Sequence, residues 1–251
     1  MRTYFYLFLM LALASCSKKV MVRFKQKDAE INSKEALALL MLVNKSPKIV
    51  LRVPDTQRVV IRDPESDTKN QKDARKSIDQ NKEVVYDDRM LYNAIEKQLF
   101  ENLNVVDRKL FNEVLSKASN VDYSKLNDLT NTDLILEWVN MNRQVPYVTK
   151  ECYQLSKKGK EQPIELESRF RRLGASIEFR LVQVKTNQMV GSYIFNYTPC
   201  ATGPGCEYLY KGGRLIPIVK HTQLGRYEIA SQAELEKFMT DATRQLVEAI
   251  R

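Results

Sequence analysis

The chain has 251 residues and a formal net charge of +9, and 43% of its residues are hydrophobic. It contains one histidine, His221. This argues against metal sites with several histidines and against Ser–His or Cys–His catalysis elsewhere in the chain. Lysine and arginine are interleaved with aspartate and glutamate, which argues against nucleic acid as a partner and favours a solvated surface, an anionic envelope surface or an acidic partner.

The first residues predict a signal peptide. Arg2 supplies a short basic start, and the apolar run 4–13 has the length of a signal-peptide core but falls short of the roughly 20 residues that cross a bilayer. The following LASC at 13–16 resembles the bacterial lipobox, in which cleavage occurs before a lipidated cysteine. We therefore expect residues 1–15 to be a lipoprotein signal peptide and Cys16 to carry the acyl chains that anchor the protein. The alternative is a plain signal peptide or N-terminal anchor that happens to contain a cysteine.

The residues after Cys16 predict the membrane in which the anchor lies. Ser17 resembles an outer-membrane address, because an aspartate at this position retains enterobacterial lipoproteins in the inner membrane. Lys18 and Lys19 do not form the acidic run that resembles a surface-export tag in some phyla. We therefore expect a lipid-anchored protein on the periplasmic face of the bacterial outer membrane. The polar and basic stretch 16–32 predicts a tether between the lipid and the folded domain.

Three further cysteines are available for a disulfide in the oxidising envelope: Cys152, Cys200 and Cys206. The turn between Cys200 and Cys206 is rich in glycine and proline and can bring the two sulfurs together. We predict a Cys200–Cys206 bridge. The alternatives are a pairing that uses Cys152, or free buried thiols.

The first half of the folded region alternates between helical and extended patterns. Residues 32–43 predict a helix, and 48–53 and 57–62 predict strands. The stretch 63–83 has almost no apolar residues and predicts a mobile polar loop inside one domain. Apolar residues at four-residue spacing then predict an amphipathic helix over 88–102.

A short apolar strand at Val105-Val106 separates this helix from a second helical pattern that ends near residue 118. Asp107 can accept the free N–H groups at the start of the second helix, and with Arg108 it fixes the turn. We favour this structural role over a catalytic dyad. Residues 133–139 predict a central strand in which Trp138 belongs to the core.

The second half of the chain predicts a β-hairpin and a terminal helix. Runs 175–184 and 189–197 alternate apolar and polar residues around a polar turn at 185–188. Ser231 and Glu234 have the spacing of a capping box before a helical pattern that reaches the C-terminus. The whole predicts one α+β domain over 33–251, an α/β sandwich in which helices pack on an antiparallel-rich mixed sheet.

No group of residues predicts catalysis or cofactor binding. The glycines at 203–205 and 212–213 lack the residues and helix of a phosphate loop and are interpreted as turn residues. Glu165 and Glu167 lie two residues apart, and we favour a solvated charged face over an acid/base pair. We therefore expect no enzyme activity, no cofactor and no metal.

Three motifs in order resemble the CsgG/LpoB-type lipoprotein superfamily. These are NVVDRKL at 104–110, TDLIL at 132–136 and SIEFRLVQVKTNQMV at 176–190, followed by a C-terminal helix. The family includes the curli-secretion channel lipoprotein and the lipoprotein activators of penicillin-binding proteins. Asn187 stands where the family has a turn glycine, which asparagine can replace because it tolerates positive φ. The resemblance implies a helix-on-sheet sandwich, a periplasmic location and no enzymatic activity.

Two functions are compatible with the resemblance. The favoured hypothesis is a monomeric or small-oligomeric lipoprotein that binds another envelope protein as a scaffold, assembly factor or activator. The alternative is a subunit of a CsgG-like oligomeric outer-membrane secretion channel. A channel needs two membrane-inserting hairpins with strands of 9 to 11 residues, which the family places near 144–174 and after 193. Pro146 and the Pro, Cys and Gly residues after 198 interrupt these segments here.

Overall fold

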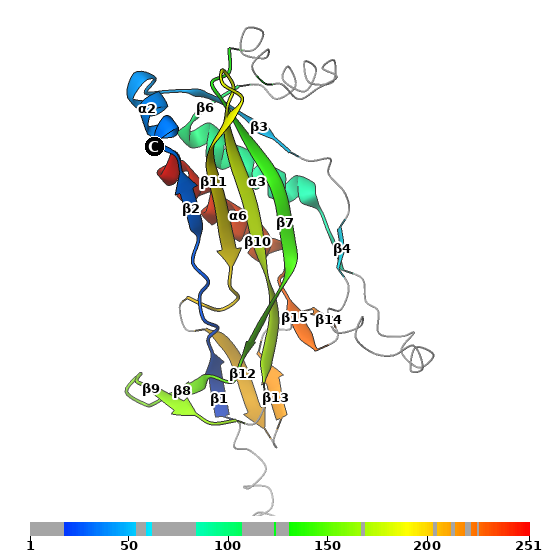
Figure 1. The fold of residues 1–251 in the computed structure, drawn as a ribbon. Helices are drawn as coiled ribbons and strands as arrows, with labels where there is room; N and C mark the ends of the chain where they lie inside the picture. Colours follow the sequence, from blue (N-terminus) through cyan, green and yellow to red (C-terminus); the bar gives the residue numbers. More distant parts are fainter. Residues whose placement is uncertain are drawn as a thin grey trace, which may run out of the picture.

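Two long strands, β7 (Leu134–Thr149) and β10 (Phe170–Gln183), run along most of the elongated molecule (Figure 1). They pair antiparallel from Leu134 opposite Gln183 to Thr149 opposite Phe170. The computed structural model describes residues 18–53, 59–61, 84–106, 123, 131–166, 169–202, 205–211, 214–218, 222–224 and 226–251.

The larger sheet is built around this pair. Antiparallel β11 flanks β10 and pairs with β2, whereas β3 and β6 add parallel strands beside β7. A short parallel contact joins β15 to β10, and β14 pairs with β15. The added strands are β2 (Glu30–Ser33), β3 (Lys48–Arg52), β6 (Asn104–Val105), β11 (Gln188–Tyr197), β14 (Gln223–Leu224) and β15 (Tyr227–Ile229). The sheet is mixed and rich in antiparallel pairs, which confirms the predicted fold class.

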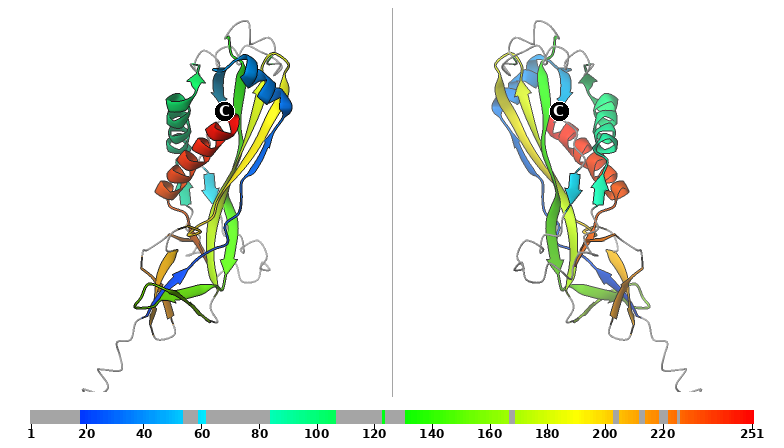
Figure 2. Two further views of the ribbon diagram at one scale, coloured as in Figure 1. Left: turned by 90° about the vertical axis from the view of Figure 1, so that its left-hand side faces the viewer. Right: turned by 90° about the vertical axis from the view of Figure 1, so that its right-hand side faces the viewer.

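Helices α3 (Asp88–Asn102) and α6 (Gln232–Ile250) cover one face of this sheet (Figure 2). The predicted spacing of Leu91, Ile95 and Leu99 is confirmed, because all three are fully buried against the sheet. Helix α2 (Glu35–Val43) lies at one end of the sheet (Figure 1). Among the helices of the described residues, none is long and apolar enough to cross a membrane.

A second, smaller sheet lies at the opposite end of the molecule from α2 (Figure 1). It has the order β13-β12-β1-β8-β9 and a core of its own. Its strands are β1 (Lys18–Val22), β8 (Cys152–Leu155), β9 (Glu161–Ile164), β12 (Cys206–Lys211) and β13 (Arg214–Pro217). Two further strands, β4 (Val59–Ile61) and β5 (Val84–Tyr86), form a separate two-stranded ribbon.

The smaller sheet corrects the prediction of a tether over 16–32. Within its described part, Lys18–Val22 is a central strand between β12 and β8, and Val20 and Val22 are buried. Glu30–Ser33 then pairs with β11 as an edge strand of the larger sheet. The predicted helix at 32–43 therefore begins only at Glu35, where strand pairing ends.

The segments that a channel would insert into a membrane belong to the two sheets of this fold. Residues 144–149 continue β7, and 152–164 contain the short strands β8 and β9 of the smaller sheet. Strands β12 and β13 follow the disulfide loop and complete that sheet. In the described residues, the strands β8, β9, β12 and β13 are four to six residues long.

The other predicted elements have mixed outcomes. The hairpin β10–β11 is confirmed, and Asn187 in its turn has φ of 51°, as expected for a residue in the place of glycine. The short strand predicted at Val105-Val106 is present one residue earlier as β6, which pairs with β3. Strand 57–62 is present as β4 over its described residues. The polar loop 63–83 and the second helical pattern, with Asp107 and Arg108, lie outside the described residues.

Candidate functional site

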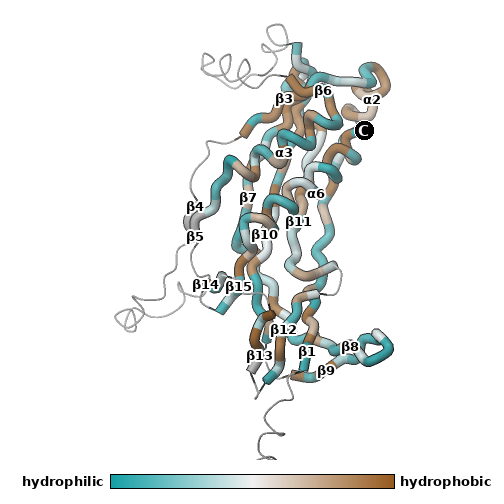
Figure 3. Tube along the Cα trace, turned by 180° about the vertical axis from the view of Figure 1, so that it is seen from behind, coloured by the Kyte–Doolittle hydropathy of each residue, from teal (hydrophilic) through white to brown (hydrophobic). Residues whose placement is uncertain are grey.

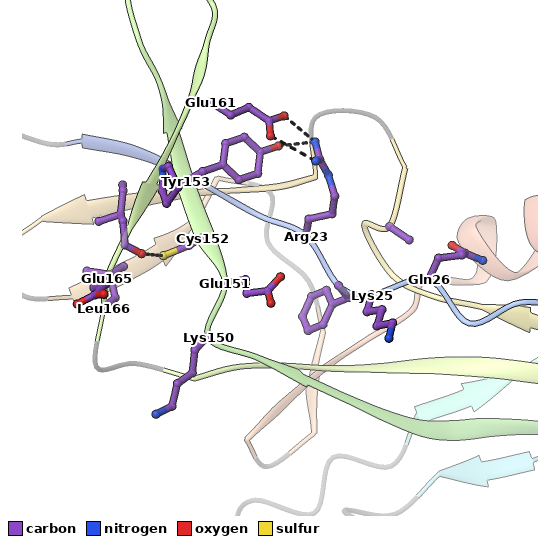
Figure 4. Close-up of a pocket in the computed structure, with 14 residues that line it drawn as sticks. Arg23, Lys25, Gln26, Lys150, Glu151, Cys152, Tyr153, Glu161, Glu165 and Leu166 are labelled. Carbon is purple, nitrogen blue, oxygen red and sulfur yellow. Dashed lines mark hydrogen bonds and ion pairs between the residues drawn. The ribbon is translucent and has the colours of Figure 1, made fainter.

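An open groove of ≈ 1030 Å³ lies beside the smaller sheet (Figure 4). One side is the segment 23–26, which follows β1. The other side is formed by the turn from β7 into β8 and by β9 with the residues after it, and Ala201 of the disulfide loop also lines the groove. The groove thus exists because β1 is held between β8 and β12.

Arg23, Tyr153 and Glu161 join the two sides of the groove. The Arg23 guanidinium donates to the Tyr153 hydroxyl oxygen at 2.9 Å and to a Glu161 carboxylate oxygen at 2.9 Å. It also lies over the Tyr153 ring, 5.1 Å from the centroid. The hydrogen bond to Glu161 raises the pKa of Arg23, and burial raises the pKa of the Tyr153 hydroxyl. The cluster ties the segment after β1 to the β8–β9 hairpin.

The groove also carries exposed charges of both signs. Lys25 and Lys150 are cationic and Glu151 and Glu165 are anionic, and all four are exposed. No ion pair within the described part of the chain involves these four side chains. Charges of both signs favour a partner that itself carries both, as a polypeptide does.

The floor of the groove is apolar. Phe24 is buried and meets the Tyr147 ring edge-on, with centroids 6.4 Å apart. Ile164 and Leu166 are partly buried and pack on the same core. An apolar floor with a polar rim is the anatomy of a protein-binding surface.

Cys152 lines the groove and is a free, buried cysteine. Its thiol donates to the Ile164 backbone oxygen at 3.2 Å, across the β8–β9 pair. Burial raises the pKa of the Cys152 thiol, which favours the protonated form. Cys152 therefore has a structural place in this hairpin.

Arg172 is a buried arginine at the junction of the two sheets, only 1% exposed. One guanidinium nitrogen contacts the sulfurs of Cys200 and Cys206 at 2.8 and 2.6 Å. The others face Glu228 at 3.7 Å and Glu234 at 3.6 Å. Arg172 thus connects the disulfide loop beside the groove to the start of α6.

The acceptors around Arg172 have partners of their own. The Tyr208 hydroxyl donates to Glu228 at 3.1 Å, and the Tyr197 hydroxyl donates to Glu234 at 2.8 Å. Burial, reinforced by these carboxylates, raises the pKa of both tyrosines. Both hydroxyls therefore stay protonated and act as donors at neutral pH.

Several predicted site residues fall in this region. Cys200 and Cys206 are joined as a disulfide, with Cα atoms 5.3 Å apart. Ser231 and Glu234 form the capping box at the start of α6. Burial raises the pKa of Glu234, but hydrogen bonds from Ser231 and Tyr197 and the charge of Arg172 outweigh burial, so the net pKa lies below its usual value.

The remaining candidates are dispersed. Glu165 lines the groove, and Trp138 is buried in the larger core as predicted. Cys16, Asp107, Arg108, Glu167 and His221 lie outside the described residues. Within the described ranges, no group of three or more His, Cys, Asp or Glu residues could hold a metal ion.

Sequence reasoning missed Arg23, Tyr153 and Glu161, because the N-terminal stretch was interpreted as a tether. The available signal was the alternation of Val20, Val22 and Phe24, all of which face the smaller core. It also missed Arg172, whose partners lie far along the chain and carry no local pattern.

No protein-family model matches the chain, and no curated protein matches it. Among solved structures, a PelC L103M dodecamer from Paraburkholderia phytofirmans aligns with a TM-score of 0.32 and 10% sequence identity, covering 90% of this chain and 99% of that chain.

Proposed function

We propose that the protein is a non-enzymatic, lipid-anchored scaffold on the periplasmic face of the bacterial outer membrane, and that its groove binds another envelope protein. The groove carries the proposal. It combines an apolar floor at Phe24 with exposed charges of both signs around the rim, which suits an extended polypeptide segment. The anchoring and the location rest on the lipobox that ends in Cys16.

The same observations favour a scaffold over a channel subunit. Within the segments that would insert into a membrane, β8, β9, β12 and β13 are short strands of a sheet with a buried core, and β8 and β9 line the groove. Light scattering in detergent separates the two proposals, because a channel requires a ring of many subunits and a scaffold requires a monomer or small oligomer.

Site-specific photo-cross-linking tests the proposal in the cells that produce the protein. A photoreactive amino acid is placed at Lys150 and Glu165 in the groove and, as matched controls, at exposed Lys97 of α3 and Glu248 of α6. We expect the groove positions to capture one defined envelope protein that the helix positions do not. Equal capture at all four positions, or none at the groove positions, would refute the proposal.

A further inference from the structure

The strand register gathers lysines at one end of the smaller sheet. Lys18 opens β1, and its partner Tyr210 directly precedes Lys211. Strand β8 runs from Cys152, opposite Val22, toward the level of Lys18, so the β8–β9 turn lies at the same end. We call this region the basic end of the smaller sheet. Its exposed lysines are Lys18, Lys19, Lys157, Lys158, Lys160 and Lys211.

The β8–β9 turn holds its three lysines in a defined loop. The Gly159 backbone N–H donates to the Ser156 carbonyl oxygen, and the Ser156 backbone N–H donates to the Lys160 carbonyl oxygen, both at 2.9 Å. Gly159 has a φ of 74°. The Ser156 hydroxyl accepts from the Lys160 N–H at 3.0 Å. This turn is hydrophilic along the chain trace (Figure 3).

Few acidic groups neutralise the basic end. Lys19 pairs with Glu207 at 2.7 Å, and Glu161 is occupied by Arg23. The other five lysines form no ion pair with any acidic residue of the described chain. The surface therefore presents a concentrated positive charge.

Exposed apolar side chains lie among these lysines. Lys19, Leu209 and Ile216 are directly opposite one another on β1, β12 and β13, so they share one face. Leu155 ends β8, at the β8–β9 turn that carries Lys157, Lys158 and Lys160. Leu155, Leu209 and Ile216 are 52%, 37% and 48% exposed.

We propose that this basic end is a membrane-contact surface that binds the anionic headgroups of phosphatidylglycerol in the bilayer that holds the lipid anchor. The position of the chain start supports a bilayer over other partners, because Lys18 lies only two residues after the predicted lipidation site Cys16. Lysines attract anionic headgroups, and exposed leucine and isoleucine side chains enter the interface beside them. Contact at this end would hold the molecule upright, with the groove near the membrane and α2 far from it (Figure 1). This membrane contact rests on the lipid anchor proposed at Cys16 and not on protein binding in the groove.

Hydrogen exchange of the full-length processed protein tests this surface. The protein is mixed with vesicles of phosphatidylcholine alone or with 30% phosphatidylglycerol. Each lysine near an anionic surface raises the membrane-binding constant on the order of fivefold. We therefore expect amides at 155–160 and 207–211 to exchange at least about fivefold more slowly with vesicles that contain phosphatidylglycerol. The protection should disappear at high salt. Amides of α2 should exchange equally with both vesicles.

Charge reversal identifies the residues responsible. Lys157→Glu, Lys158→Glu and Lys160→Glu together should abolish the protection, whereas the charge-matched Lys34→Glu, Lys45→Glu and Lys237→Glu, all exposed elsewhere, should preserve it. Circular dichroism establishes that both variants are folded, and single reversals replace any triple variant that is not. Equal exchange with both vesicles, or equal loss in both variants, would overturn the proposal. So would protection by an acidic protein and none by phosphatidylglycerol.

Discussion

Replacing Arg172 with methionine tests the buried cluster that joins the two sheets. The substitution keeps an unbranched side chain of similar length and removes the charge, so Glu228 and Glu234 lose their cationic partner. The side chain of Glu228 is only 10% exposed, so water cannot solvate its carboxylate in place of Arg172. Breaking a buried ion pair on one side costs about 3 to 5 kcal/mol. Since Glu234 is 30% exposed and both contacts exceed 3.5 Å, we expect a loss of about 3 kcal/mol, the lower end of that range.

Guanidinium unfolding in oxidising buffer measures this loss, which corresponds to about 6 to 12 °C in Tm for a chain of this size. Arg180→Met is the matched control, because Arg180 is 46% exposed in its pair with Glu178 and should lose at most about 1 kcal/mol. Adding Glu228→Gln to Arg172→Met should restore part of the stability, because the amide remains an acceptor for Tyr208 without a stranded charge. Equal losses in the two arginine variants, or no recovery in the double variant, would refute this account.

Four further predictions concern the same framework. Ser231→Ala removes the capping-box hydroxyl and should destabilise the protein by about 1 kcal/mol in urea unfolding, whereas Ser231→Asp should not. Glu234, whose folded pKa is depressed below its ordinary value of 4.5, stabilises the protein above that pH and should lose this contribution as pH falls through the folded pKa; Glu234→Gln should flatten the acid limb of stability against pH. Replacing Cys200 and Cys206 with serine opens a short loop and should cost about 2 kcal/mol, measured against wild type with and without reductant. Gly174→Ala should lower Tm more than any of these, because its Cβ would lie 2.2 Å from the Tyr197 carbonyl oxygen, which β-sheet pairing holds in place; an unchanged Tm would contradict that geometry.

The larger sheet was predictable where local patterns agree with tertiary packing. Apolar residues at alternate positions mark much of both strands of the β10–β11 hairpin around a polar turn, and α3 has a regular apolar face, so each element can be identified from a few residues. The extent of β7 was not predictable, because residues after Asn140 mix polar side chains with Pro146. They are extended because β10 lies alongside them, with Leu173 opposite Pro146.

The groove could not be predicted because it depends on contacts between distant segments. Strand β1 has a basic composition that matches a tether, and its burial depends on β8 and β12, which come more than a hundred residues later. Arg172 resembles the other arginines of its strand in sequence, and only the fold places it against two carboxylates and a disulfide. The capping box was predictable because its two residues are three apart on one helix start.

The affinity of the cross-linked partner for groove variants tests the central claim most directly. Glu151→Lys with Glu165→Lys reverses the two acidic charges of the rim, and Glu101→Lys with Glu248→Lys makes the same change on exposed positions of α3 and α6. By calorimetry, we expect the groove variant to raise Kd by about tenfold or more, equivalent to about 1.4 kcal/mol, and the helix variant to match wild type. An unchanged Kd for the groove variant, or the same increase in both, would contradict binding in the groove.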